Sequence, residues 1–532
     1  MSLARLAELC GVERAYHDIY GKRREASEET LRALLGAMRL PVENAAQITE
    51  SIERIERLAR QRRLPPVHVA TEGMEIRIDC IPPADSPLDG ITWKIHGEDG
   101  SVREGRAAPA DVKQRILRIA EPPSPGYHRL EVDFGENERA AADLIVAPER
   151  CYEPAALESD GRLWGMTTSL YSLRAEGDWG IGDFTALRAL VDDAADLGAD
   201  LIGLNPLHAL FPHNPHHVSP YSPSSRLFKS FLYLDIPAIP DFAECEEARR
   251  RVAAPEFQER LDRARAASAV DYPAVHSAKR EVLELLYRSF RQRHRDDERA
   301  AAFARYRESE GGELQRHALY EALQEHFHAQ DPEVWGWPLW PVSYRHPATP
   351  EVAAFAEEHA ERVGFFAYVQ WQVDRQLAEA GLRSAERHLG IGLCEDLAVG
   401  IDSAGADAWA NQEQFAIGVG IGAPPDPFNP EGQDWGLPPF VPIRLRETGY
   451  RLFTQMLRHN MRHSGALRID HILGLMRQFW VPAGRSPREG TYVRFPFEDL
   501  LGILALESRR NRCLVIGEDL GTIPDGLREG LM

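Results

Sequence analysis

From about residue 161 onward, strand-like and helix-like segments alternate, and this alternation constrains the fold more than any other feature. Residues 163–170 are strand-like, 184–197 resemble a helix, and 200–206 form the apolar run of a buried strand. Strand, helix, strand is the pattern of a βαβ unit, whose strands run parallel. Three further strands are predicted at 390–399, 466–470 and 513–517. About five such units favour an α/β fold of the TIM type, a (β/α)₈ barrel that is not complete.

A long helical stretch interrupts this alternation at about 243–385. It is too long for a bare connection between a strand and a helix, so we predict an inserted helical subdomain. Its apolar stripe is typical of core packing and is formed by Leu283, Leu286, Tyr287 and Phe290.

Two smaller regions precede the alternating part. Residues 1–66 are predicted to be a helical segment, because Leu31, Leu34 and Leu35 fall on one helix face. Residues 67–148 alternate apolar and polar positions between Gly/Pro-rich turns, which predicts a small β-sandwich. We interpret both as accessory regions and assign 149–532 to the barrel domain.

Composition excludes several classes of protein. The 532 residues contain 62 Lys and Arg against 82 Asp and Glu, a formal net charge of −20. Such a chain repels nucleic acid and anionic lipid, so we expect neither partner. No run approaches the ~20 apolar residues of a membrane span, and the first residues lack an apolar signal region. These features predict a cytoplasmic protein. The six scattered cysteines suggest neither a disulfide framework nor a zinc cluster.

Two of the predicted strands end in carboxylates, Asp470 and Glu518. The carboxyl ends of parallel barrel strands meet on one rim, where catalytic side chains lie. Paired carboxylates suit glycoside chemistry, in which one attacks the sugar and the other carries a proton. Arg468 should share a strand face with Asp470, so its guanidinium would keep that carboxylate ionised. The alternative is that these carboxylates cap helices or pair with arginines.

Tryptophans lie in two Pro/Gly-rich loops. An exposed ring can stack on a sugar face, whereas a buried ring anchors its loop to the core. The core reading is favoured for Trp335 and Trp337, and both readings stay open for Trp435.

Two other motifs are less informative. Residues 208–222 contain four histidines, but their Pro and Asn content predicts an irregular, solvent-facing loop, and we expect no metal. The glycines of 418–422 resemble a phosphate loop, yet the prolines that follow forbid the required helix. We predict a flexible loop that covers substrate.

Taken together, the motifs resemble one family, the 4-α-glucanotransferases (amylomaltases, or disproportionating enzymes) of the α-amylase-like barrel superfamily. The matching segments occur in the family's order at 169–173 (SLYSL), 178–184 (DWGIGDF), 205–208 (NPLH), 219–226 (SPYSPSSR), 335–341 (WGWPLWP), 395–400 (EDLAVG), 422–426 (GAPPD), 433–436 (QDWG), 468–471 (RIDH) and 517–521 (GEDLG). The N-terminal extension resembles the longer bacterial form of the enzyme.

The resemblance implies a role for individual residues. Asp470 would be the nucleophile, Glu518 the general acid/base, and Arg468 the support of Asp470. The implied substrate-binding residues are Ser219, Tyr221, Asp396, Asp426, Trp435 and His471. Tyr221 would line the donor subsites, and Trp435 would border the acceptor side. The implied reaction is a retaining transfer, without cofactor, of an α-1,4-glucan segment to the 4-hydroxyl of a second glucan or of glucose, with maltooligosaccharides as substrates.

The sequence departs from the family in one respect. Members carry a third essential carboxylate in a Thr-His-Asp motif after a later strand, and this chain ends at Met532 without it. We therefore expect a C-terminally truncated fragment that is inactive as written. The alternatives are an α-glucan hydrolase or branching enzyme of the same superfamily, and a non-catalytic glucan-binding fragment.

Overall fold

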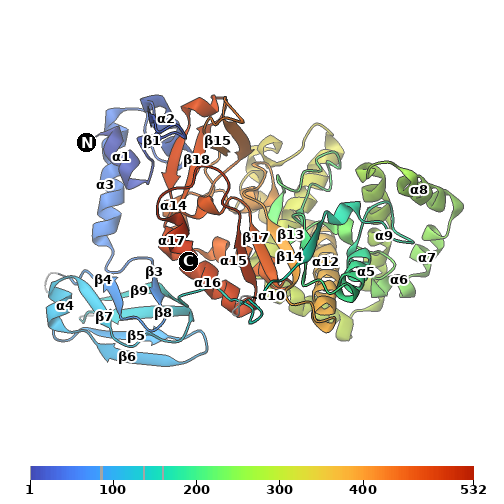
Figure 1. Cartoon of the computed structure of the whole chain (residues 1–532), viewed down its shortest axis with the longest axis horizontal. Coiled ribbons are helices and arrows are strands. Elements are labelled where there is room, and N and C mark those ends of the chain that lie inside the picture. The colour runs from blue at the N-terminus through green and yellow to red at the C-terminus, as the bar shows by residue number, and fades with distance from the viewer. Residues whose placement is uncertain (1, 84–87, 136–137, 158–160, 532) are drawn as a thin grey trace. The chain divides into compact units, whose positions relative to one another are not determined.

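The computed structural model describes residues 2–83, 88–135, 138–157 and 161–531 (Figure 1). The chain divides into two compact units, described here one at a time. The first comprises Met1–Glu153, Glu413–Arg458 and His471–Met532, and the second comprises Pro154–Gln412 and His459–Asp470.

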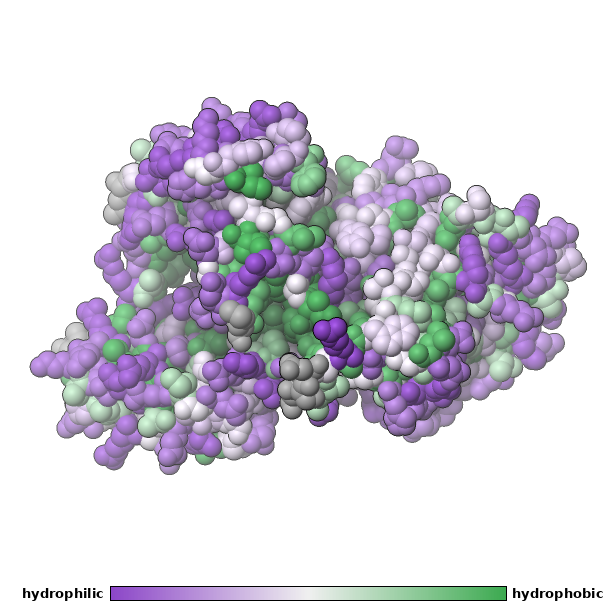
Figure 2. Space-filling view, in the orientation of Figure 1, coloured by the Kyte–Doolittle hydropathy of each residue, from purple (hydrophilic) through white to green (hydrophobic). Residues whose placement is uncertain are grey.

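Among the described helices, none has the length and apolarity needed to cross a membrane. Figure 2 shows hydrophilic residues over most of the visible surface of the N-terminal β-strands and of the helical insertion.

The first unit begins with three helices and a small hairpin. Their bounds are α1 (Leu3–Leu9), β1 (Ala15–His17), β2 (Arg23–Glu25), α2 (Glu28–Ala37) and α3 (Ala45–Gln61). The prediction of a purely helical segment is therefore wrong at the hairpin. A carboxylate oxygen of Asp18 accepts the backbone N–H groups of Tyr20 and Lys22 at 3.0 and 2.9 Å, and Gly21 has a φ of 72°. This local turn chemistry reverses the chain where helical periodicity gave no signal.

The next part of the first unit is rich in β-strands. One sheet has the order β3-β9-β8-β5-β6, and β4 pairs with β7. The bounds are β3 (Val67–Thr71), β4 (Ile76–Asp79), β5 (Thr92–His96), β6 (Val102–Arg106), α4 (Pro109–Lys113), β7 (Ile116–Ile119), β8 (Gly126–Asp133) and β9 (Arg139–Ala147). The predicted alternation is confirmed at Ile76 and Ile78, whose side chains are buried in an apolar core with Leu130 and Val132.

The C-terminal part of the first unit contains an antiparallel sheet of order β16-β15-β18-β19. The bounds are β15 (Val419–Ala423), β16 (Gln433–Leu437), α14 (Pro442–Glu447), α15 (Arg451–Met461, which continues into the second unit), β18 (Arg477–Pro482), β19 (Thr491–Arg494), α16 (Phe497–Asn511), β20 (Leu514–Gly517) and α17 (Leu527–Leu531). The flexible loop predicted at 418–422 is thus mostly strand β15. A Cβ on Gly420 would lie 2.1 Å from Asp434 Oδ1, and one on Gly422 would lie 2.0 Å from the Gln433 carbonyl. These glycines permit close strand pairing rather than flexibility.

The second unit contains a parallel sheet with the order β10-β11-β14-β17. Its elements are β10 (Gly165–Thr168), α5 (Phe184–Asp196), β11 (Leu201–Leu204), β14 (Gly392–Leu397) and β17 (Ala466–Ile469). The predicted βαβ unit and these four predicted strands are confirmed. The N-cap of α5 is Asp183, whose side chain accepts the N–H of Ala186. Leu393 and Leu467 are fully buried on neighbouring strands.

The helical insertion lies between β13 (Ser225–Lys229), which pairs with β12 (His208–Ala209), and β14. It consists of α6 (Pro240–Glu244), α7 (Glu246–Val252), α8 (Pro255–Ala266), α9 (Tyr272–Arg293), α10 (Glu298–Gln330), α11 (Pro350–Glu358) and α12 (Ala360–Glu386), followed after β14 by α13 (Ala406–Ala410). The predicted stretch is helical, and its apolar stripe on α9 is buried as expected.

Candidate active site

The predicted site residues fall into two groups, one in each unit. In the second unit, β14 and β17 pair in parallel with Asp396 opposite Arg468. The guanidinium of Arg468 donates from Nη1 to Asp396 Oδ1 at 2.6 Å and from Nη2 to Asp470 Oδ1 at 2.9 Å. The backbone N–H of Asp470 donates to the Leu397 carbonyl at 3.1 Å. The predicted contact between Arg468 and Asp470 is present, and Asp396 joins it through the strand register.

Charge and burial oppose each other in this group. Burial raises the pKa of Asp396 and the charge of Asp470 raises it further, while the hydrogen bond from Arg468 acts in the opposite direction. Burial alone would lower the pKa of Arg468, but its bonds and charge contacts with the two carboxylates outweigh burial and raise it. The guanidinium therefore stays protonated and holds two carboxylates at fixed positions.

Tyr221 and Ser219 lie on the segment that precedes β13. Tyr221 lies near the carboxylates of Asp396 and Asp470, and its pKa is raised first by partial burial and then by their charges. Nearly half of the Tyr221 surface is exposed, which leaves the ring accessible. Ser219 is exposed, and its carbonyl accepts the N–H of Ser222 at 3.3 Å. The structure brings Tyr221 to the carboxylates and records no such contact for Ser219.

The histidine-rich segment that precedes Tyr221 is solvent-facing only in part: His216 is exposed as predicted, whereas the side chains of His208 and His213 are buried. His208 is buried on β12, and its Nε2 accepts the N–H of Ala398 at 3.2 Å, which holds the chain after β14. The His213 side chain is buried among helices of the insertion. Apolar neighbours such as Phe211 carry these side chains inward, which local composition did not reveal.

The tryptophans at 335 and 337 differ in their burial. The indole Nε1 of Trp337 donates to the Ser403 carbonyl at 3.0 Å, and the residue is half-buried, so it anchors its loop as predicted. Trp335 packs edge-to-face on Phe211, with ring centroids 5.5 Å apart, but it is 37% exposed. The prediction of a core residue is therefore wrong for Trp335.

Sequence reasoning missed a buried ion pair at Glu395, the residue that precedes Asp396 on β14. The Lys229 ammonium bonds to the Glu395 carboxylate and donates to Asn460 Oδ1 at 2.6 Å. The Ser464 hydroxyl donates to the other Glu395 oxygen at 2.7 Å. This network joins β13 and β14 to the end of α15 directly beside the Asp396–Arg468 contact. The signal in the sequence was the charged pair Glu395-Asp396 inside an apolar strand.

In the first unit, His471 and Glu518 form the second group. His471 has a φ of 53°, in the left-handed region, which turns the chain immediately after Asp470 into a short 3₁₀ helix (Ile472–Leu475). Its backbone N–H donates to Glu518 Oε2 at 3.0 Å, and the Ile472 N–H donates to the Glu518 carbonyl at 2.9 Å. The Leu520 N–H donates to Glu518 Oε1 at 2.6 Å. Three backbone bonds therefore orient Glu518. The left-handed backbone conformation of His471 is strained for a residue with a side chain, and such strain is common at functional sites.

Trp435 joins this second group through His471. The two rings meet edge-to-face with centroids 5.4 Å apart, and the indole Nε1 donates to Gln433 Oε1 at 3.1 Å. Asp426 lies on the connection between β15 and β16, the strand that carries Trp435, and its Oδ1 accepts the N–H groups of Phe428 and Asn429 at 2.7 and 2.6 Å. Asp426 thus shapes its own loop.

The described residues contain one group of possible metal ligands, made up of Asp241, Glu244 and His294 in the helical insertion. Asp241 already accepts two bonds from the Arg299 guanidinium and one from the Tyr368 hydroxyl. His294 bonds to Glu244 at 2.8 Å. We therefore assign this cluster to ion pairing within the insertion.

Comparison with known families gives two matches. Residues 168–532 match the family model described as 4-alpha-glucanotransferase. Residues 63–148 match the model of the MalQ N-terminal beta sandwich domain. The first match includes every predicted site residue, and the second coincides with the β-rich part of the first unit.

Curated relatives extend over nearly the whole chain. A 4-alpha-glucanotransferase of Haemophilus influenzae is 35% identical and covers 99% of this chain and 73% of the relative. One of Mycobacterium tuberculosis is 36% identical and covers 100% of this chain and 74% of the relative.

Solved structures agree with this assignment. The crystal structure of amylomaltase from Corynebacterium glutamicum has a TM-score of 0.84 and 32% identity, covering 99% of this chain and 73% of that one. The fold also resembles amylomaltase from Streptococcus agalactiae in complex with acarbose, with a TM-score of 0.56, 20% identity, and coverage of 70% of this chain and 71% of that one. The chain therefore has an amylomaltase-like α/β fold with an N-terminal β-sandwich and belongs to the 4-alpha-glucanotransferase family.

Proposed function

We propose that this α-glucan transferase works by a retaining double displacement in which Asp470 is the nucleophile and Glu518 the general acid/base. The observation that carries the proposal is the guanidinium of Arg468, which holds Asp470 Oδ1 at 2.9 Å. Because that bond occupies Oδ1, we assign the attack to Oδ2. A carboxylate fixed and charged in this way is suited to attack an anomeric carbon.

In the first step, Asp470 forms a bond to the anomeric carbon of the donor glucan as the glycosidic C–O bond breaks. Glu518 gives its proton to the departing 4-oxygen and becomes a carboxylate. In the second step, Glu518 takes the proton from the 4-hydroxyl of the acceptor, whose oxygen displaces Asp470 from the sugar. The enzyme ends in its starting state, and one α-1,4 bond has replaced another.

The contacts of Glu518 fit a group that changes its charge. Both carboxyl oxygens accept backbone N–H groups, from His471 and from Leu520. A carboxylate oxygen is a stronger acceptor than the oxygens of a protonated carboxyl group. Both bonds therefore strengthen when Glu518 becomes a carboxylate after the first proton transfer, which favours the covalent intermediate.

We assign the remaining residues by their neighbours. Tyr221, which lies near Asp396 and Asp470, lines the donor side together with Ser219. Trp435 and His471 form the acceptor side, and Asp426 shapes the connection that borders it. We also propose that the parallel strands belong to a TIM-type (β/α)₈ barrel, a fold in which the active site is formed at the carboxyl ends of the strands.

The proposal is tested with α-maltosyl fluoride, because its leaving group needs no protonation. In Glu518→Gln the first step should proceed and the second should stall, so a maltosyl adduct accumulates. Peptide mass spectrometry should find that adduct on Asp470, and the double variant Asp470→Asn/Glu518→Gln should form none. An adduct on another residue, or formed equally in the double variant, would refute the assignment.

Product analysis separates transfer from hydrolysis. With maltotriose, transfer yields glucose and longer maltooligosaccharides without a net gain of reducing ends. A rise in reducing ends would instead indicate the α-glucan hydrolase named among the alternatives.

A further inference from the structure

Arg226 is a buried cation of the second unit that takes no part in the reaction steps. It lies on β13, and only 5% of its surface is exposed. Its Nη1 atom donates to the carbonyls of Ala398 at 2.9 Å and Val399 at 2.8 Å. Burial lowers the pKa of the guanidinium to about 10, so it is still charged at neutral pH. Burying a charge is costly, and hydrogen bonds to two carbonyls offset part of that cost.

The two carbonyls belong to the turn that leaves β14. Ala398 follows the last residue of that strand, and its own N–H donates to Nε2 of His208 at 3.2 Å. Burial and the charges of Lys229 and Arg226 hold the pKa of His208 well below its usual range, so the ring is neutral and Nε2 can accept. Side chains from the paired strands β12 and β13 therefore hold Ala398 at both its N–H and its carbonyl.

Asp470, the proposed nucleophile, is joined to the same turn. The carbonyl of Leu397, which precedes Ala398, accepts the backbone N–H of Asp470 at 3.1 Å. Asp396, one residue earlier, lies opposite Arg468 and shares its guanidinium with Asp470. A shift of the turn at Ala398 would therefore displace the backbone of Asp470 and the carboxylate of Asp396 together.

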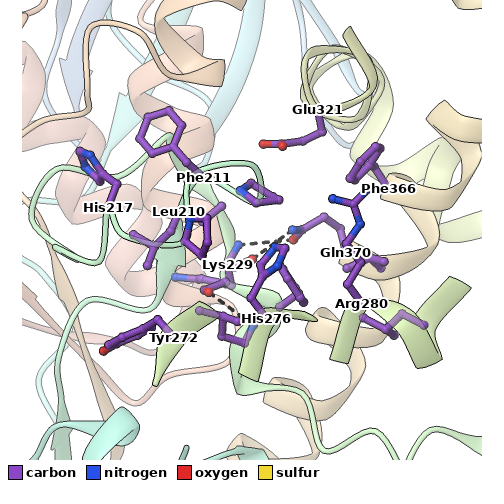
Figure 3. A pocket seen from close by; sticks show the side chains of 18 of the residues that line it. Leu210, Phe211, His217, Lys229, Tyr272, His276, Arg280, Glu321, Phe366 and Gln370 are labelled. Carbon is purple, nitrogen blue, oxygen red and sulfur yellow. Dashed lines mark hydrogen bonds between the residues drawn. The ribbon is translucent and has the colours of Figure 1, made fainter. Parts of the chain in front are cut away.

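Strand β13 is itself fixed at both ends, so it can act as a support. The Arg226 N–H donates to Asp407 Oδ2 at 2.8 Å, and the Arg226 carbonyl accepts from Asn460 Nδ2 at 2.9 Å. At the other end of the strand, Gln370 of α12 donates from Nε2 to the Lys229 carbonyl at 3.0 Å, and Figure 3 shows these two residues side by side. A guanidinium on such a strand has a defined position.

We propose that Arg226 is a positioning residue for the transfer reaction, which sets the place of the Asp470 carboxylate by holding the peptide of Ala398. The inference rests on the proposed role of Asp470 as nucleophile. Attack on an anomeric carbon depends on the position of the attacking oxygen, because a displacement of about 1 Å can cost ~10²-fold in rate. Arg468 aligns the Asp470 side chain, whereas Arg226 fixes the backbone from which that side chain extends.

The test measures how fast the maltosyl adduct forms in the Glu518→Gln chain with α-maltosyl fluoride in excess. The chain is completed with the Thr-His-Asp motif if the 532 residues alone form no adduct. Arg226→Met removes both donors, and we expect the rate constant at saturating substrate to fall by about 10²-fold, with the adduct still formed on nearly all of the protein. Arg226→Lys keeps two donors on one nitrogen, as Nη1 does, and should lose less than about tenfold.

Arg265→Met is the matched control, because Arg265 also donates to two backbone carbonyls, those of Asp178 and Gly177. It should leave the rate constant within about twofold. A merely structural role of Arg226 would lower the melting temperature and the fraction of protein that forms the adduct, with an unchanged rate constant. That result would overturn the proposal. An adduct on a residue other than Asp470 would refute the nucleophile assignment and the inference with it.

If neither variant of Arg226 folds, amide hydrogen exchange on the unaltered chain decides the proposal. The N–H groups of Ala398 and Asp470 should exchange as slowly as those within β14, because the turn is held from both sides. Mass spectrometry of peptides that contain these residues measures the exchange. Exchange more than about 100-fold faster than in β14 would show that the turn opens freely, which a positioning role of Arg226 excludes.

Discussion

Arg468 Nη1 lies 2.6 Å from Asp396 Oδ1, across two neighbouring parallel strands. The same guanidinium holds Asp470 at 2.9 Å, so one cation fixes two carboxylates that belong to different strands. The planar fork of arginine can bridge two acceptors in this way, whereas the single ammonium of lysine cannot hold both in the same geometry.

Replacing Arg468 tests the importance of this bridge. We expect Arg468→Lys to lower kcat/KM for transfer by on the order of 10²-fold, because the nucleophile loses its fixed position while charge is kept. Steady-state kinetics with maltotriose measure the loss, in a chain completed with the Thr-His-Asp motif where the 532 residues alone show no transfer. Arg188→Lys, which alters a surface pair with Glu379, is the matched control and should leave kcat/KM within about twofold. Equal effects in both variants would contradict the proposed role.

Trp435→Leu separates acceptor binding from chemistry. The ring is half-buried and packs edge-to-face on His471, so it is available as a stacking surface. We expect the KM for the acceptor glucose to rise by about tenfold, as for the loss of one stacking contact, with little change in donor affinity. Trp164→Leu, at another partly exposed tryptophan, serves as the control and should leave the KM for glucose unchanged. A purely structural role of Trp435 would instead lower the melting temperature without this selective change.

The ion pair of Lys229 and Glu395 provides a stability test. Both side chains are buried, so Lys229→Met leaves an unpaired carboxylate and should cost about 3–5 kcal/mol of unfolding free energy. The double variant Lys229→Met/Glu395→Leu should recover most of that loss, because no buried charge remains. Urea unfolding followed by circular dichroism measures both. Lys94→Met, in an exposed pair with Glu104, should cost less than about 1 kcal/mol.

Glu321 makes the stability of the chain depend on pH. Burial raises the pKa of Glu321 from its ordinary value of 4.5 to about 8, so the folded protein keeps a proton that the unfolded chain releases. The wild type should therefore lose stability as pH rises from about 4.5 to 8, by up to about 5 kcal/mol relative to Glu321→Gln, whose side chain does not titrate. Unfolding free energies of the two proteins should agree near pH 4 and differ most above pH 8. A difference that does not change with pH would contradict this expectation, and the exposed Glu308→Gln is the control.

Local patterns were sufficient for much of the fold. Alternating apolar positions predicted β4, short apolar runs predicted the parallel strands, and the helix-like segment 184–197 predicted α5. These features depend on residues that are close in sequence. The hairpin β1–β2 was missed because its signal is the turn chemistry of Asp18 and Gly21 rather than periodicity.

The candidate site was predictable in part. The period of two placed Arg468 beside Asp470, the strand ends singled out Asp470 and Glu518, and resemblance to the family supplied their roles. Neither source predicted that the His471 backbone would bind the Glu518 carboxyl, because that contact requires the left-handed turn at His471. The roles of Asp470 and Glu518 stay a proposal until the adduct experiment is done.

By itself, the sequence determined the order of the elements, the family and the residue types that carry the chemistry. The tertiary structure decided which side chains are buried together. Lys229 and Glu395 are 166 positions apart, and His213 meets Glu321 only because the insertion packs on the segment that precedes Tyr221. Burial of such groups depends on contacts between distant segments, and periodicity within one segment carries no information about them.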